Sequence, residues 1–151
     1  MHPSLNRTAA SATLHCLTGC AIGEVIGMIL TTLGNLGTAA SIAISIVLAF
    51  LFGYSFSLLP LVRGGLSFKK ALGIALAADT VSIAVMELSD NGFVLAVPGA
   101  IYAGLNTALF WWSLAVSLCV AFVCAFPVNR FLIARGKGHA IAHHYHEHRT
   151  H

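Results

Sequence analysis

The chain has 151 residues, of which 58% are hydrophobic and only 9% are charged, whereas an ordinary soluble domain has about 25% charged residues. This composition excludes a disordered chain, and it leaves too few charged side chains to cover the surface of a soluble globule. At about 20 residues per transmembrane helix, the length allows four spans. We therefore expect an all-α, polytopic transmembrane bundle of four helices in a lipid bilayer.

Four apolar runs define the expected spans. They cover residues 13–33, 38–59, 71–88 and 106–126, and the last run continues past Pro127 toward residue 135 in one interpretation. A turn cluster at 34–37 ends the first run, Pro60 ends the second, and Ser67 is the expected N-cap of the third. Residues 93–104 are apolar but broken by proline and glycine, which predicts an interfacial or re-entrant connection. The expected organisation is an N-terminal segment at 1–11, a membrane domain at 12–135 and a His-rich tail at 136–151.

The distribution of lysine and arginine predicts the orientation. These residues lie in the N-terminal segment, in the loop between the second and third spans, and in the C-terminal segment, whereas the other two connections carry none. Both termini are therefore expected in the cytoplasm. Because the basic residues form no stripe interleaved with aromatic residues, nucleic acid is not an expected partner.

The first span carries two patterns with a spacing of four residues. Gly19, Gly23 and Gly27 form a small-xxx-small pattern, which allows another helix backbone to approach closely. Cys16, Cys20 and Glu24 form an overlapping stripe, and His15 lies at its edge. Each cysteine alone is typical of a small apolar filler, but the whole set is a candidate for metal ligation or for thiol redox chemistry.

The third span carries an acidic face. Asp79, Met86 and Asp90 lie within a narrow arc, and Ser82 and Glu87 flank it. Asp79 is expected about 13 Å into the bilayer, where an acid needs a partner or a proton. Glu24, Asp79, Glu87 and Asp90 are therefore candidates for a proton or ion pathway. The alternatives are a protonated packing role for Asp79 and interfacial positions for Glu87 and Asp90.

The fourth span is expected to complete the site. Cys124 lies near the angular line of Ser113 and Ser117, whereas Cys119 points away and is expected to be a filler. Angle and depth together predict that Cys124 converges with Cys16, Cys20 and Asp79 in one layer. Thiolates and thioethers select Cu(I), and with imidazole or carboxylate they suit Zn(II). The predicted metal ligands are His15, Cys16, Cys20, Met86 and Cys124.

The C-terminal tail is a second candidate metal-binding region. Its six histidines are typical of labile metal capture, and a polar disordered tail is the alternative. They are His139, His143, His144, His146, His148 and His151.

Three stretches resemble a known family. They are His-Cys-Leu-Thr-Gly-Cys-Ala-Ile-Gly-Glu at 15–24, Ala-Ala-Asp-Thr-Val-Ser-Ile-Ala-Val-Met-Glu at 77–87 and Phe-Pro-Val-Asn-Arg at 126–130. Together they resemble the bacterial membrane proteins grouped as domain of unknown function 4396. The resemblance covers about residues 12–140 and implies a small polytopic membrane protein, and it implies no activity.

The leading hypothesis is an inner-membrane protein that binds, and in one interpretation transports, a copper or zinc ion. A thiol-disulfide redox protein and a non-catalytic subunit or assembly factor of a membrane complex are the alternatives. The chain shows no nucleotide loop and no nucleophile-base set, so an enzyme is not favoured. Heme is not expected, because only one histidine lies in a span. A homo-oligomer around a shared pathway is a further expectation, because four helices form a thin bundle.

Overall fold

The computed structural model describes residues 3–135, which form four long helices and one short helical turn. Each long helix is long and apolar enough to cross a membrane, and no strand occurs in this part of the chain. The predicted all-α transmembrane bundle is therefore confirmed. The elements are α1 (Pro3–Leu33), α2 (Thr38–Arg63), α3 (Phe68–Ala96), η1 (Ala100–Tyr102) and α4 (Ala108–Ala134).

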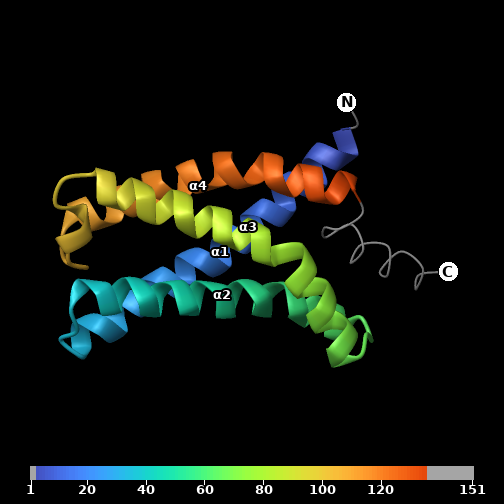
Figure 1. Ribbon diagram of the computed structural model, residues 1–151, viewed down its shortest axis with the longest axis horizontal. Helices are drawn as coiled ribbons and strands as arrows, with labels where there is room; N and C mark the ends of the chain where they lie inside the picture. Colours follow the sequence, from blue (N-terminus) through green and yellow to red (C-terminus); the bar gives the residue numbers. More distant parts are fainter. Residues whose placement is uncertain (1–2, 136–151) are drawn as a thin grey trace.

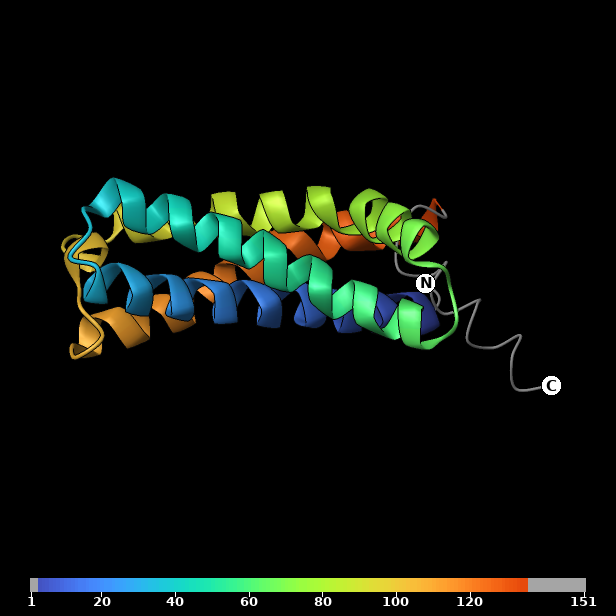
Figure 2. The ribbon, with the colours of Figure 1, turned by 90° about the horizontal axis from the view of Figure 1, so that it is seen from below.

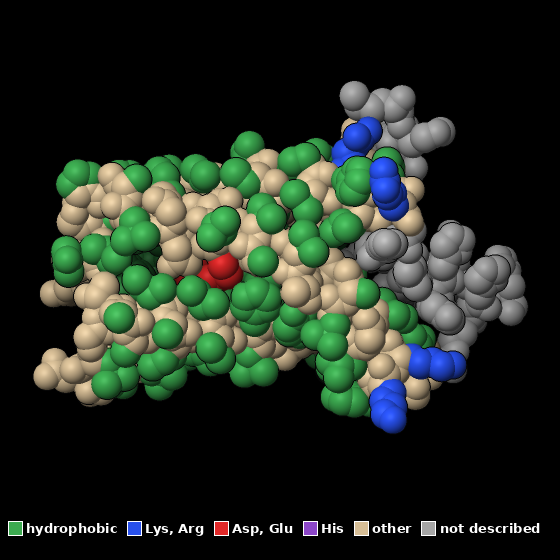
Figure 3. Space-filling model, in the orientation of Figure 1, with side chains coloured by type: hydrophobic (Ala, Val, Ile, Leu, Met, Phe, Trp, Pro, Cys, Tyr) green, Lys and Arg blue, Asp and Glu red, His purple; other side chains and the backbone are tan. Residues whose placement is uncertain are grey.

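The helices alternate in direction along the bundle (Figures 1 and 2). The start of α1, the turn between α2 and α3 and the end of α4 lie at one end, and the other two connections lie at the opposite end. Lysine and arginine side chains gather at the first of these ends, as Figure 3 shows. We call it the basic end. The bundle therefore has two chemically different ends, as membrane-spanning proteins commonly do.

Helix α3 is longer than the hydropathy pattern predicts. It continues through the polar cluster at residues 89–92, where the sequence suggested an end, and it stops at Ala96. Ser89 Oγ donates to the Val85 carbonyl at 2.8 Å, and Asn91 Nδ2 donates to the Glu87 carbonyl at 2.9 Å. The Ser89 and Asn91 side chains are thus satisfied by their own helix and do not terminate it. The expected connection at 93–104 accordingly shrinks to a short loop that contains η1.

The other boundaries differ less. Helix α1 begins at Pro3, ahead of the expected span, and α2 passes Pro60 by three residues to end at Arg63. Helix α4 continues through Pro127 to Ala134, in line with the longer of the two expected ends. Ser67 occupies the N-cap position of α3, although its side chain makes no capping hydrogen bond.

Glycines bring α1 and α2 into backbone contact. A Cβ atom on Gly19 would lie 2.8 Å from Gly53 Cα, and one on Gly23 would lie 2.6 Å from Ala49 Cα. A Cβ atom on Gly27 would collide with the side chain of Ser45. The spacing of four residues on each helix therefore forms one continuous small-residue seam.

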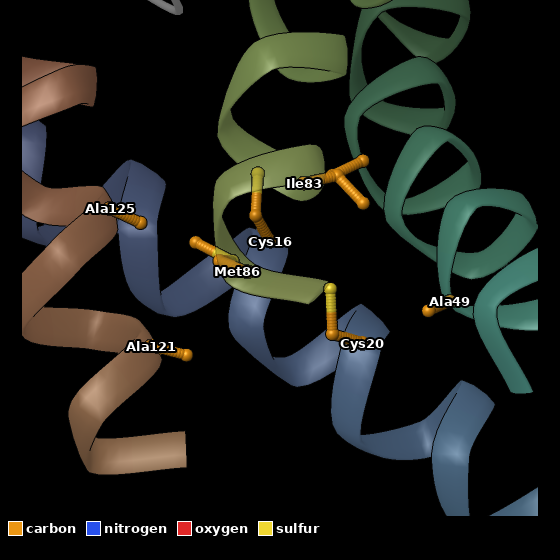
Figure 4. Packing of buried hydrophobic residues seen from close by; sticks show 7 residues of the cluster. All are labelled: Cys16, Cys20, Ala49, Ile83, Met86, Ala121 and Ala125. Atoms are coloured by element: carbon orange, nitrogen blue, oxygen red, sulfur yellow. The ribbon is translucent and has the colours of Figure 1, made fainter. Parts of the chain in front are cut away.

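The centre of the bundle is built from small side chains and sulfur. In Figure 4 the thiols of Cys16 and Cys20 point from α1 toward α3, where Met86 and Ile83 lie, while alanines of α2 and α4 close the sides. The alanines are Ala49, Ala121 and Ala125. Helix α1 crosses the bundle obliquely, so that it packs against α2 and, nearer its start, against α4 (Figure 1).

Candidate functional site

Two rows of polar side chains face each other across the contact between α1 and α3. Cys16, Cys20 and Glu24 follow one another at intervals of one turn on α1. Opposite them, α3 carries a row of acids with Ser82 among them: Asp79, Glu87 and Asp90. We call the six thiol and carboxyl residues the polar file, because they follow one another along the bundle axis.

Contacts across the file pair a residue of α1 with a residue of α3 at each level. The Cys16 thiol donates to Asp79 Oδ1 over 3.7 Å, which is within the range of a sulfur hydrogen bond. One turn along, the Cys20 thiol lies close to the Glu87 carboxyl group.

At the end of the file farthest from the Lys and Arg side chains, the Glu24 and Asp90 carboxyl groups lie near each other. The file therefore passes from two thiol–carboxyl pairs to a carboxyl–carboxyl pair.

Five of the six residues of the file are buried, and Glu24 is partly exposed. Cys16, Cys20 and Asp79 are each 1% exposed, and Asp90 is 4% exposed. Three buried carboxyl oxygens have no hydrogen-bond partner, and they are Oε1 of Glu24, Oε1 of Glu87 and Oδ1 of Asp90. Buried acids without such partners are strongly disfavoured unless a proton or a cation neutralises them.

The described part of the chain supplies no basic side chain to this file. Its lysines and arginines lie near the ends of the helices, at the basic end. Figure 3 shows one acidic patch at mid-length, in the seam between α2 and α3, surrounded by hydrophobic side chains. The arrangement can therefore accept positive charge from outside the chain.

A cavity of about 90 Å³ lies where the file ends at Glu24 and Asp90. Its polar lining consists of these two acids, the Asn91 amide and hydroxyl groups from α2 and α4, and hydrophobic residues complete the wall. The hydroxyl groups belong to Thr38, Ser41, Ser45 and Ser113. We call this cavity the vestibule.

Met86 lies beside the file, whereas His15 does not join it. Met86 is 1% exposed and packs with Cys16 and Cys20, so its thioether lies in the same layer. The exposed His15 ring turns toward α2, where Nε2 donates to the Phe56 carbonyl at 3.1 Å. That carbonyl lacks its usual helical donor, because the residue one turn ahead is Pro60, which has no N–H. His15 therefore completes the hydrogen bonding of α2, and it is not placed as a ligand.

Cys124 is also outside the file, which corrects the expected convergence of three helices. Its side chain is exposed, as is that of Cys119, whereas Ala121 and Ala125 take the inward positions of α4. The buried positions of α4 step by four residues from Ser113 onward, so the buried line drifts by about 40° per step. The prediction that Cys124 points inward is wrong, because it assumed a buried line that runs straight along α4. The buried line instead winds around the helix.

Two polar features of the bundle were not assigned by the sequence reasoning: a buried serine beside the file, and a contact between α1 and α4 nearer the basic end. Ser82 is fully buried between Asp79 and Met86, and its Oγ has no hydrogen-bond partner. Nearer the basic end, Asn129 Nδ2 donates to Thr13 Oγ1 at 2.9 Å, which ties α4 to α1. The position of Ser82 on the acidic face of α3 could have assigned it to the site. In contrast, no pattern within one helix could pair Asn129 with Thr13.

No group of three or more His, Cys, Asp or Glu side chains within residues 3–135 is arranged to hold a metal ion. The six tail histidines, from His139 to His151, lie outside the described residues.

Comparison with known proteins identifies the family alone. No curated protein and no solved structure matches the chain. A family model described as Domain of unknown function (DUF4396) matches residues 5–138, which is most of the chain and includes every residue of the polar file. The chain therefore belongs to this family.

Proposed function

We propose that this protein is a multi-pass protein of a bacterial inner membrane that binds a soft transition-metal ion in the polar file and moves it along the bundle. One observation carries the proposal. The thiols of α1 face the acids of α3, and no basic side chain among the described residues is their partner. Such a file favours a cation, because a cation removes the cost of the buried acids.

The sulfur atoms decide the class of cation. Cys16, Cys20 and Met86 lie in one buried layer, and thiolate and thioether ligands select Cu(I), or Zn(II) when carboxylates complete the set. A bound ion would use Cys20 and Glu87, which already face each other, and would displace the thiol proton. Because no three-ligand group is preassembled in residues 3–135, uptake requires a small rotation of side chains around this pair.

The remaining features suit such a route. The tail histidines supply imidazole ligands for exchangeable capture, and the positive-inside rule places the basic end in the cytoplasm. An ion that passes the thiol layer then meets Glu24 and Asp90 at the other end of the file. A soft ion therefore moves from thiol ligands, which bind it tightly, to oxygen ligands, which bind it weakly.

The geometry favours this proposal over a redox pair of Cys16 and Cys20. Residues four apart on a helix have Cβ atoms about 5–6 Å apart, whereas a disulfide requires about 3.5–4.5 Å. Both thiols point toward α3 and lie beside different acids. A disulfide between them would require the helix to unwind locally.

The test is metal content and flux in the purified full-length protein. We expect saturable binding of Cu(I) or Zn(II) that is lost in Cys20→Ser and Glu87→Gln, with Cys119→Ser as the matched control because that cysteine is exposed. In liposomes the same two variants should abolish metal flux. Equal metal content in all four proteins would refute the proposal.

A further inference from the structure

The vestibule has donor chemistry that differs from the thiol layer. Every polar group in its wall is a carboxyl, a hydroxyl or an amide group and so presents oxygen. No cysteine and no imidazole lines the cavity, and its one sulfur atom is the Met28 thioether in the apolar wall. Oxygen-only sets suit hard cations, whereas a soft ion gains little from them. The vestibule therefore fits a ligand other than the proposed cargo.

The hydrogen bonds around the vestibule leave oxygen lone pairs available. Ser113 uses its hydroxyl proton on the Phe110 carbonyl at 3.0 Å, so its Oγ presents lone pairs. Asn91 directs its amide nitrogen to Glu87, so its amide oxygen remains available to coordinate a cation. Asp90 is only 4% exposed, and its Oδ1 has no hydrogen-bond partner.

The charge of the vestibule sets the valence of the ligand. Glu24 and Asp90 lie near each other in its wall, and no Lys, Arg or His side chain lines the cavity. Two ionised carboxylates in contact are balanced by one divalent cation, as in oxygen sites for Mg²⁺ and Ca²⁺. The volume of about 90 Å³ exceeds the roughly 10–15 Å³ that one water needs, so the ion can retain water ligands.

We propose that the vestibule binds an alkaline-earth cation, Mg²⁺ or Ca²⁺, between the carboxylates of Glu24 and Asp90. Hydroxyl groups of Ser45 and Ser113 and the Asn91 amide complete the coordination together with water. The vestibule lies toward the end opposite the basic end, near the start of α2 and of α4. The site is separate from the thiol layer and would hold α1 and α3 together at that end of the bundle.

The experiment is calorimetric titration of MgCl₂ and CaCl₂ into the chelator-treated, full-length protein in lipid nanodiscs at constant ionic strength. We expect saturable binding of at least one ion, with a Kd of about 10⁻⁴–10⁻³ M, as in weak oxygen sites. Asp90→Asn keeps the shape of the side chain and should weaken binding about tenfold or more, because ligand charge tunes the affinity of such sites over decades.

A serine pair on α2 supplies the matched control. Ser45→Ala removes a vestibule oxygen and should weaken binding, whereas Ser55→Ala removes an exposed hydroxyl that bonds only its own helix and should leave binding unchanged. Size-exclusion profiles and far-UV circular dichroism establish that each variant is assembled.

Three results would overturn the proposal: no saturable heat with either ion, unchanged affinity in both Asp90→Asn and Ser45→Ala, or heat that tracks proton uptake and not metal. Copper and zinc uptake by the same preparations is scored separately. Loss of that uptake with intact Mg²⁺ or Ca²⁺ binding would remove the proposed function and leave the vestibule site.

Discussion

Replacing Gly23 with alanine should push α1 away from α2. The new Cβ atom would lie 2.6 Å from Ala49 Cα and 2.7 Å from the carbonyl carbon of Leu48, and both atoms belong to the backbone of α2. Ala49 N lies closer still, so reaching an ordinary contact of about 3.4 Å requires the helices to separate by about 1 Å locally. A gap of that size removes a quarter to a half of the dispersion energy of the affected contacts.

The expected cost is a balance of two effects. Overpacking of this kind destabilises by about 1–3 kcal/mol, and the better helix propensity of alanine returns up to about 1 kcal/mol. We therefore expect a net loss of about 1–2 kcal/mol in the free energy of unfolding. Gly73→Ala is the matched control, because no atom lies within 4 Å of its added Cβ and only the propensity gain of about 0.5–1 kcal/mol applies.

The assay is unfolding of the purified protein in mixed micelles of increasing denaturing-detergent fraction, followed by far-UV circular dichroism. The two glycine variants should shift the midpoint in opposite directions. If Gly23→Ala is as stable as Gly73→Ala, then the close backbone contact of α1 and α2 is not the seam that holds the bundle, and the reasoning fails.

Three further expectations follow from the contacts. His15→Ala should destabilise the protein by about 1–3 kcal/mol in the same assay, because it leaves the Phe56 carbonyl unsatisfied. Adding Pro60→Ala should restore stability, because an alanine at that position returns the helical N–H. Equal losses in the single and the double variant would contradict this role of His15. A membrane-permeant maleimide should label Cys124 in the folded protein but Cys16 only after denaturation, and labelling of Cys16 in the folded protein, read by mass spectrometry, would contradict the burial of the file. Reporter fusions in the turn between α2 and α3 should report the cytoplasm and those between α3 and α4 the outside; the reverse pattern would invert the topology.

The polar face of α1 was predictable because it depends on one helix alone. Cys16, Cys20 and Glu24 repeat every four residues, and a repeat of four places side chains on one side of a helix whatever its neighbours are. The four apolar runs were predictable for a similar reason, since the bilayer requires each crossing to be long and apolar. The length of α3 was not, because hydropathy cannot show that Ser89 and Asn91 bond back to their own helix.

Pairing across helices was decided by the way the helices cross. Asp79 meets Cys16 and Asp90 meets Glu24 because α1 runs obliquely past α3, and Cys124 turns outward because the contact line winds around α4. Counting 100° per residue describes the directions on each helix but not the angle between two helices. Contacts between small residues, such as Gly23 of α1 against Ala49 of α2, fix how α1 lies in the bundle, and they arise only when both helices are packed. Composition and periodicity therefore determined the membrane bundle and its polar faces, whereas packing decided which polar side chains meet.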